Sequence, residues 1–448
     1  MLAGGPMALT ALLLVRASAQ METGARIETR VGDAPTGALS VPSDPTSVPV
    51  AAQQAQVMVV ATPILKLRWT TGVDDVRLDS ATRIFWRPVP LLGTRPLFLE
   101  TLGATDTRRP TKRSRWRLDL RGTYGEEDYT SLSQQFANQP TLPVSTTMFM
   151  ANGSVDALWR NSRRTTLTFR LGVIHRRTLD AQPVASKVPG TSLAPLSLPT
   201  QTSVTASPAL HWTVTRRFGI EASAPVFDYD FQDITQASAP AGHTNIASIQ
   251  PQMGFLEELS RRHQLHFVAG LTFAYALQGS NTKLGHHVTP LVRVDLNSTL
   301  YRTRATAVQS SVGAGTNWLV DPVLGTGVWR GVAQANFDAT IGPHWTTGAR
   351  FMFTTNLSAR LPTADGPSAN GAPIYIDETI VSAEIPVRHR WSNLLLVEFG
   401  GRFAERAPRL SAPRFAWRER ELWAFLTLFA ATRVQLSTAR SPGNTIEM

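Results

Sequence analysis

Cysteine is absent from this sequence. Its absence excludes disulfides, thiolate metal sites, cysteine nucleophiles and the lipid-bearing cysteine of a lipoprotein. Long apolar runs are missing as well, because no stretch approaches the roughly 18 residues that a transmembrane helix needs. The hydrophobic fraction is nevertheless 42% of 448 residues. If the chain spans a membrane, it must do so with strands.

Motifs for nucleotide and calcium binding are also missing, since the sequence has no P-loop, no Rossmann fingerprint and no EF-hand loop. His286 and His287 are adjacent, so on a strand their rings point to opposite faces and do not share a metal ion. His211 and His266 lie on polar strand faces, but no Ser or Asp stands at a recognisable catalytic spacing from either. We therefore predict no enzymatic activity, no cofactor and no bound metal.

The charge balance is basic, with a formal net charge of +11. An excess of this size raises nucleic acid as a partner. The arginines, however, fall in separate predicted turns and form no basic stripe with interleaved stacking aromatics. We predict no nucleic-acid partner, and we leave open whether the basic turns contact an anionic polymer or an acidic substrate, or are simply solvated.

Period-two alternation is the clearest structural signal. In residues 264–278, Leu265, Phe267 and Leu271 alternate with His266, Gly270 and Thr272. At about 3.3 Å per residue and a tilt near 40°, a strand of this length climbs on the order of 30 Å, close to one hydrocarbon thickness. Similar alternation recurs in residues 202–214, 287–301, 328–341 and 345–358.

The apolar faces of so many strands cannot all point inward, because the interior of a large barrel is too wide for side chains to fill. This favours lipid outside and water inside. Six tryptophans near predicted strand ends suit an aromatic girdle, namely Trp159, Trp212, Trp318, Trp329, Trp345 and Trp391. Packing of these indoles in the interior of a soluble protein is the alternative.

Short basic turns alternate with longer loops, as in the hairpin repeat of an up-and-down barrel. The short set is 160–164, 216–217, 261–262, 302–304, 342–344 and 388–393, and the long set includes 126–143, 179–199, 232–243 and 359–373. With these features the chain resembles the Gram-negative outer-membrane β-barrel class, porin-like in the broad sense. Its arginine-rich composition and residues 124–132 (YGEEDYTSL) are also similar to uncharacterised barrels of myxobacteria.

The predicted organisation follows from these patterns. An apolar core at residues 8–15 and the run Ala17, Ser18, Ala19 predict a signal peptide, residues 1–19, and export. Residues 20–60 read as a flexible periplasmic segment, 61–436 as the barrel and 437–448 as a polar tail. The strand candidates are odd in number, whereas single-chain bacterial barrels close with an even one. We therefore predict an all-β, transmembrane, antiparallel up-and-down barrel of about 16 strands, with 14 and 18 as alternatives.

Charged residues on the polar parity are the candidate lumen wall: Arg293, Asp295, Arg330, Asp338, Arg350, Glu378, Glu384, Glu398 and Arg402. Opposed charges on a pore wall filter solutes by charge and size, and the alternative is a packed interior of ion-pair ladders. The predicted function is an outer-membrane channel for polar solutes.

Two other functions stay open. One is an exit port for a secreted polysaccharide, and the other is a structural or surface-interaction barrel with a closed lumen. The expected partners are outer-membrane lipid and the barrel assembly machinery, with polysaccharide or small polar solutes as cargo. Trp423, Phe425 and Phe429 in the last predicted strand are candidates for the assembly signal, although this strand does not end the chain.

Overall fold

The computed structural model describes residues 18–40, 50–86, 96–128, 145–182, 200–236, 239–279, 287–321, 326–358, 378–392, 394–408 and 419–438. All regular structure in these ranges is β-strand. None of them contains a helix long and apolar enough to cross a membrane.

The β elements follow one another in chain order and their bounds are β1 Ser18–Ser40, β2 Val50–Thr70, β3 Asp74–Trp86, β4 Leu97–Thr111, β5 Ser114–Asp128, β6 Ser145–Arg160, β7 Thr165–Gln182, β8 Thr200–Thr213, β9 Phe218–Ser223, β10 Val226–Gln236, β11 Ala239–Ile249, β12 Gln252–Ser260, β13 His263–Gly279, β14 His287–Arg302, β15 Thr306–Asp321, β16 Thr326–Ile341, β17 Trp345–Ser358, β18 Glu378–Arg390, β19 Leu395–Pro408 and β20 Glu419–Thr438.

Two of the strands are each divided into two elements by a proline. β9 and β10 both pair with β8 and are separated at Pro225, while β11 and β12 both pair with β13 and are separated at Pro251. Proline has no amide hydrogen to donate to a ladder, so the pairing is interrupted there. With each divided strand counted once, the barrel has eighteen strands, an even number that was one of the predicted alternatives to about 16.

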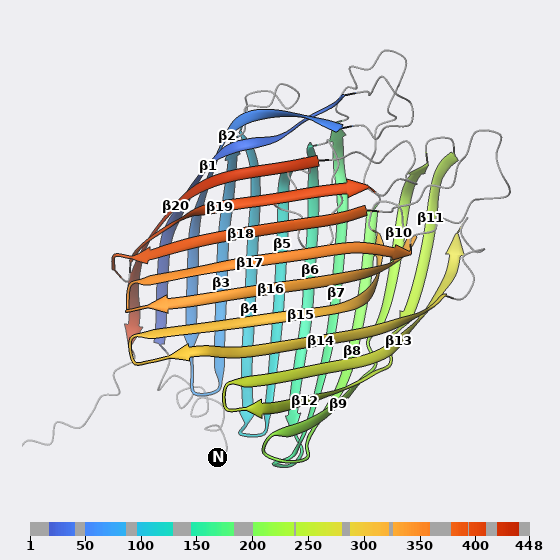
Figure 1. Ribbon diagram of the computed structural model, residues 1–448, viewed down its shortest axis with the longest axis vertical. Coiled ribbons are helices and arrows are strands. Elements are labelled where there is room, and N and C mark those ends of the chain that lie inside the picture. Colours follow the sequence, from blue (N-terminus) through green and yellow to red (C-terminus); the bar gives the residue numbers. More distant parts are fainter. Residues whose placement is uncertain are drawn as a thin grey trace, which may run out of the picture.

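The sheet closes on itself, because β1 pairs antiparallel with both β2 and β20. Every strand in the described part of the chain thus has a neighbour on each side, and no sheet edge is left unpaired there. In Figure 1 the strands β13–β19 cross in front of β3–β8, as two facing walls of a tilted barrel do. The predicted all-β antiparallel barrel is confirmed.

The prediction of a flexible segment at 20–60 was wrong, since β1 and β2 occupy most of it. β1 does alternate, with Glu22, Arg26, Glu28 and Arg30 on one parity and small or β-branched residues on the other. Its composition is too polar to suggest burial on its own. The strand is stabilised by the ladders with β2 and β20, which are non-local partners.

The barrel therefore begins at Ser18 rather than near residue 61, and β20 extends to Thr438. Ser18 and Ala19, which the prediction gave to the signal peptide, lie in β1, and Ser437 and Thr438, which it gave to the tail, lie in β20. Residues 1–17 and 439–448 lie outside the described residues, so the cleaved signal peptide and the polar tail stay predictions. The long loops at 126–143, 179–199 and 359–373 also fall largely outside the described part. The loop predicted at 232–243 is shorter than expected, because β10 continues to Gln236 and β11 begins at Ala239.

The short turns all lie at one end of the barrel, and most of them are closed by a side-chain hydroxyl. In most of them a Ser or Thr hydroxyl accepts a hydrogen bond from a backbone amide two or three residues later, a local bond that closes a tight turn. These residues are Thr71, Thr111, Ser162, Thr215, Ser260, Thr303 and Ser392. The turn at 342–344 instead uses Gly342 with a positive φ of 62°. The predicted turns are thus present, and hydroxyls close them rather than the arginines.

Candidate functional site

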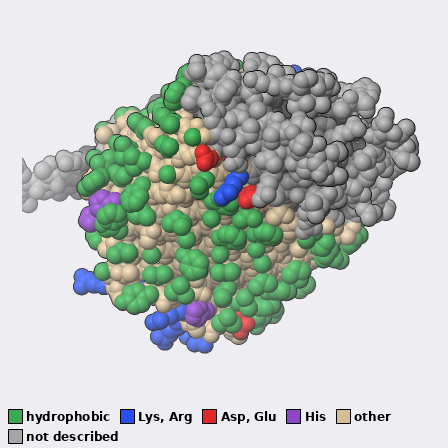
Figure 2. Space-filling view, turned by 45° about the horizontal axis from the view of Figure 1, so that its top comes forward, with side chains coloured by type: hydrophobic (Ala, Val, Ile, Leu, Met, Phe, Trp, Pro, Cys, Tyr) green, Lys and Arg blue, Asp and Glu red, His purple; other side chains and the backbone are tan. Residues whose placement is uncertain are grey.

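The wall of the barrel has two chemically different faces. Along nearly every strand, the alternate residues that point outward include exposed large apolar side chains. Among them are Ile27, Leu65, Leu102, Leu120, Leu171, Leu210, Leu271, Val312, Phe337, Phe351, Phe399 and Leu426. Figure 2 shows one side of this surface, where hydrophobic side chains dominate and most charged ones gather near its lower edge. The other parity carries most of the ion pairs and lines the lumen.

Two aromatic rims bound the apolar outer face. Exposed Trp69, Trp116, Trp159, Trp212, Trp345 and Trp391 lie at the short-turn end, and exposed Trp86, Phe98, Tyr124, Phe149 and Tyr275 lie towards the other end. Phe149 and Trp159 stand ten residues apart on β6. At about 3.3 Å per residue and a tilt near 40°, this spacing spans roughly 25 Å, the height of the apolar band of a membrane barrel.

Three of the predicted lumen residues form a ladder across β17, β18 and β19. Arg350 pairs in register with Glu384, and Glu384 with Arg402. Arg402 Nη2 lies 2.6 Å from Glu384 Oε2, and Arg350 Nη1 lies 3.8 Å from Glu384 Oε1. One carboxylate is thus shared by two guanidinium groups, which satisfies more of its oxygen lone pairs than a single partner would.

The other predicted lumen residues lie on the same inward parity in smaller groups. Arg293 Nε is 2.5 Å from Asp295 Oδ2 on β14, and Glu398 accepts from Arg388 Nε at 2.6 Å. Arg330 Nε donates to Asn356 Oδ1 at 3.0 Å. Asp338 is exposed and makes no ion pair with any described residue. Glu378 begins β18, but its side chain lies outside the described part.

The histidine that shared the predicted polar face belongs to this ion-pair pattern. His266 on β13 has its Nε2 2.7 Å from Glu221 Oε1 on β9 and its Nδ1 3.8 Å from Asp295 Oδ2 on β14. Across the described ranges, no group of three His, Asp or Glu side chains is arranged to hold a metal ion.

Sequence reasoning missed a second charged region, on the inner face of β2–β7. Here Asp75 is bound by two arginines: Arg68 donates from Nε and Nη2 at 2.9 Å each, and Arg77 Nη2 lies 2.7 Å away. Asp119 and Asp156 each pair with one arginine, Arg117 and Arg170 respectively. The signal was present, since these arginines alternate with outward leucines such as Leu118 and Leu171.

One arginine in this region is buried without a hydrogen-bond partner at two of its nitrogens. Arg176 on β7 is 5% exposed, and its Nε and Nη2 are buried with no partner in the structure. In Arg68, the corresponding two nitrogens donate to both oxygens of Asp75. The cross-strand neighbours of Arg176, Met150 and Gln201, carry no charge that could compensate it.

The first strand adds a compact charge group that was also missed, because residues 20–60 were predicted to be flexible. Glu28 accepts from Arg26 Nη2 at 2.8 Å and from Arg30 Nε. Glu28 and Arg30 are each 7% exposed. A pair this deeply buried requires partners for both charges, because removing either one would leave an uncompensated ion.

Apolar clusters also line parts of the inner face near the ends of the strands opposite the short turns. Met58, Val60, Phe85, Leu97 and Trp423 form one of them, beside the closure of the barrel. Trp423 and Phe425 are nearly buried and lie on the inward parity of β20. The aromatic series of the last strand is thus largely internal, and its role in assembly stays a prediction.

The second cluster shows that the end of the β15–β16 hairpin bends inward. The ladder of β14 with β15 ends at Gly315, whereas β15 and β16 stay paired to Asp321. Trp318 is 7% exposed and packs with Phe231 and Ile246, and its ring meets Tyr229 edge-on at a centroid distance of 6.4 Å. In the lower part of β15, the face that carries Trp318 points out of the barrel. Because Trp318 nevertheless contacts inward-facing residues, the hairpin end must fold across the inner face of β10 and β11. Trp318 is therefore not part of an outer girdle, contrary to the prediction.

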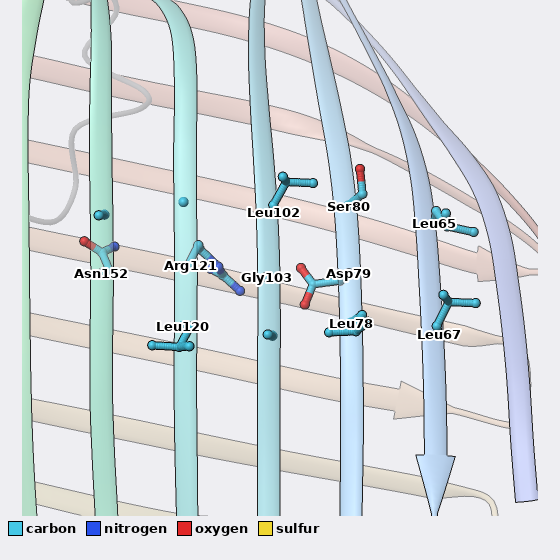
Figure 3. A pocket seen from close by; sticks show the side chains of 13 residues that line it. Leu65, Leu67, Leu78, Asp79, Ser80, Leu102, Gly103, Leu120, Arg121 and Asn152 are labelled. Atoms are coloured by element: carbon cyan, nitrogen blue, oxygen red, sulfur yellow. The ribbon is translucent and has the colours of Figure 1, made fainter.

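The outer face of β2–β6 carries a shallow apolar groove. Small residues, namely Ser80, Ala104, Gly122 and Ala151, leave space between projecting leucines. Figure 3 shows Leu65, Leu67, Leu78, Leu102 and Leu120 around it, with the strands of the opposite wall behind. A groove with this lining suits hydrocarbon rather than a polar ligand.

Comparisons with known proteins assign neither a family nor a function to this chain. No protein-family model matches the sequence, and a search of curated proteins finds no match. Among solved structures, OpdL of Pseudomonas aeruginosa has 12% identity and a TM-score of 0.40, with 94% of this chain and 99% of that chain covered. The copper transporter OprC has 9% identity and a TM-score of 0.49, with 94% and 81% covered. The outer membrane protein OpdK of Pseudomonas aeruginosa has 9% identity and a TM-score of 0.42, with 92% and 99% covered. These values are too low for a family, a solute or a partner to be transferred to this chain.

Proposed function

We propose that this chain is an outer-membrane channel that passes polar solutes through a charged lumen. The observation that carries the proposal is the division of the closed wall into an apolar outer band between two aromatic rims and an ion-paired inner face. In lipid every backbone polar group must be paired within the protein, and a closed barrel meets that requirement. The same division leaves a polar surface facing inward, where only water and solutes can meet it.

The width of the barrel supports an open passage. Eight strands already leave an interior that side chains just fill, and eighteen enclose a much wider one. Several lumen arginines are well exposed, with Arg170 at 67% and Arg293 at 61% of their side-chain surface. Charges of both signs on the wall then act as a filter of solutes by charge and size.

The proposed location implies two sets of partners. Outer-membrane lipid covers the band of exposed apolar residues, including the groove of β2–β6. The barrel assembly machinery is the expected partner during insertion, with β20 as the strand that completes the barrel against β1. Export by a cleaved signal peptide belongs to the same proposal.

A second candidate function is a barrel with a closed lumen that serves a structural or surface-binding role. The inward bend of the β15–β16 hairpin favours it, because this hairpin end occupies space inside the barrel opposite the short turns. The two candidates differ in whether folded protein conducts ions.

Single-channel recording in planar bilayers separates them. Refolded protein that shows heat-modifiable gel mobility should produce discrete conductance steps in KCl if the channel proposal is correct. Correctly folded protein that never passes current would contradict it and favour the closed barrel. Recovery of the protein as a soluble periplasmic species would overturn the membrane location itself.

A further inference from the structure

Charge is distributed unevenly around the lumen. On the inner face of β2–β7 the basic residues clearly outnumber the acidic ones. Among the side chains that the structure describes on this face, the basic ones are Lys66, Arg68, Arg77, Arg83, Arg115, Arg117, Arg121, Arg160, Arg170 and Arg176, and the acidic ones are Asp75, Asp79, Asp119 and Asp156. On the facing strands β14–β19 the charges are more nearly matched, as in the Arg293–Asp295 pair and the Arg350–Glu384–Arg402 ladder.

The acids of this wall are recessed and the arginines project. Asp75 is 22% exposed, against 44% for Arg68 and 55% for Arg77. Asp156 is 27% exposed against 67% for its partner Arg170. A solute in the lumen therefore meets guanidinium groups before it meets carboxylates, and the recessed acids only partly offset the local positive potential.

Arg121 is one of the projecting cations that lack a direct ion pair. It is exposed on β5 and makes no ion pair with a described residue. Figure 3 shows its side chain extending from β5 towards β4, with Gly103 of β4 and Asp79 of β3 beyond its tip. A Cβ atom at position 103 would lie 2.6 Å from Asp79 Oδ1, so the glycine provides the space for this arrangement.

Arg176 shows the same excess in a buried setting. Its Nε and Nη2 edge has no acceptor, although this is the edge that binds both oxygens of a carboxylate in the Arg68–Asp75 pair. The wall thus provides more donor groups for anions than its own acids satisfy.

We infer that the inner face of β2–β7 makes the channel selective for anions, with Arg117, Arg121 and Arg170 as the residues that set the preference. The inference rests on the proposed channel function and adds the solute class to it. The arginines raise the local concentration of anionic solutes along this wall and lower that of cations.

The test is the reversal potential of the intact barrel in a bilayer that separates two KCl concentrations. The wild-type protein should show a higher permeability to chloride than to potassium. Arg121→Gln should move the reversal potential towards zero, and the triple change Arg117→Gln, Arg121→Gln and Arg170→Gln should lower the permeability ratio by about twofold or more. Heat-modifiable mobility checks that each variant is folded, and Arg170→Gln alone replaces Arg121→Gln should the latter fail to fold.

Arg350→Gln is the matched control, because Arg350 is also an exposed lumen arginine, with 48% of its side chain accessible, and lies on the more balanced wall. It should shift the reversal potential less than Arg121→Gln does. A conducting barrel that prefers potassium, or an equal shift in the control, would overturn the inference and leave the channel function standing. A folded barrel without any conductance would overturn the channel function, and this inference with it.

Discussion

Gly32 of β1 lies opposite Trp423 of β20, at the seam where the first and last strands close the barrel. A Cβ atom at position 32 would overlap the backbone carbonyl of Leu422. Trp423, whose Cα would lie 2.8 Å from that Cβ, is 1% exposed and packs against Met58 and Phe85, so the backbone here cannot move aside. The closure of the barrel therefore requires a glycine at position 32.

Gly32→Ala should therefore destabilise the barrel by about 1–3 kcal/mol, the usual cost of forcing an extra carbon into a packed site. Urea unfolding in detergent micelles, followed by gel mobility, measures the loss. Gly122→Ala is the control, because a Cβ at position 122 meets no atom within 4 Å. Equal losses in the two variants would show that the seam is not the reason.

The hydroxyl turns give a second prediction. Ser162 Oγ accepts hydrogen bonds from the amides of Arg164 and Thr165 at 3.1 and 3.0 Å. Ser162→Ala should lower the free energy of unfolding by about 1 kcal/mol, since both amides lose a fixed acceptor and gain only water. Ser154→Ala on the adjacent β6 should cost less, as the Ser154 hydroxyl has no hydrogen-bond partner among the described side chains. If Ser162→Ala leaves the free energy of unfolding unchanged, the turn is held by its backbone alone.

Arg176 gives a third prediction, with the opposite sign. A buried cation without an acceptor loses hydration that nothing replaces, and apolar replacements of buried charges often stabilise proteins. Arg176→Met, next to Met150, should raise the free energy of unfolding by about 1 kcal/mol or more in anion-free detergent buffer. The unfolding midpoint in urea measures the change.

The comparison for this variant is Arg170→Met, on the same strand and the same face. Arg170 is well exposed and bound to Asp156, so its loss should be neutral or mildly destabilising. A destabilising Arg176→Met would indicate that the guanidinium is compensated in the folded barrel and would count against an unsatisfied donor edge there.

Most of the strands could be predicted from alternation alone. Residues 264–278 were expected as a strand, and β13 spans His263–Gly279, because a long apolar parity facing away from a polar one leaves little choice of register. β1 could not be found this way. Its inward-facing residues are charged and its outward-facing residues are mostly small or β-branched. The strand is held by partners about 40 and 400 residues away in the chain, such as Lys66 for Glu22 and Thr432 for Thr23.

The candidate site was predictable as a set of residues but not as an arrangement. Parity places Arg350, Glu384 and Arg402 on the inner face, yet only the register of three strands shows that Glu384 lies between the two arginines. The same limit applies to the wall of β2–β7, where the excess of arginine emerges only when six strands are placed side by side. Trp318 is the clearest failure of parity, because a bend in the hairpin, which no local pattern encodes, carries an outward residue to Tyr229 on β10.

This contact leads to the last prediction, which rests on the proposed channel function. Trp318→Ala removes the buried indole that joins the β15–β16 hairpin end to Phe231 and Ile246. The rest of β15 stays paired with β14 and β16 below Gly315, so the barrel should persist while the hairpin end loses its contact with β10 and β11. Single-channel conductance in KCl should then increase, since less of the lumen is occupied.

Trp345→Ala is the control, because Trp345 is exposed on the outer face at the short-turn rim and should leave conductance unchanged. If Trp318→Ala conducts like the wild type while still folding, the bent hairpin does not narrow the ion path, and the narrowest part of the channel must lie among the charged residues of the inner wall.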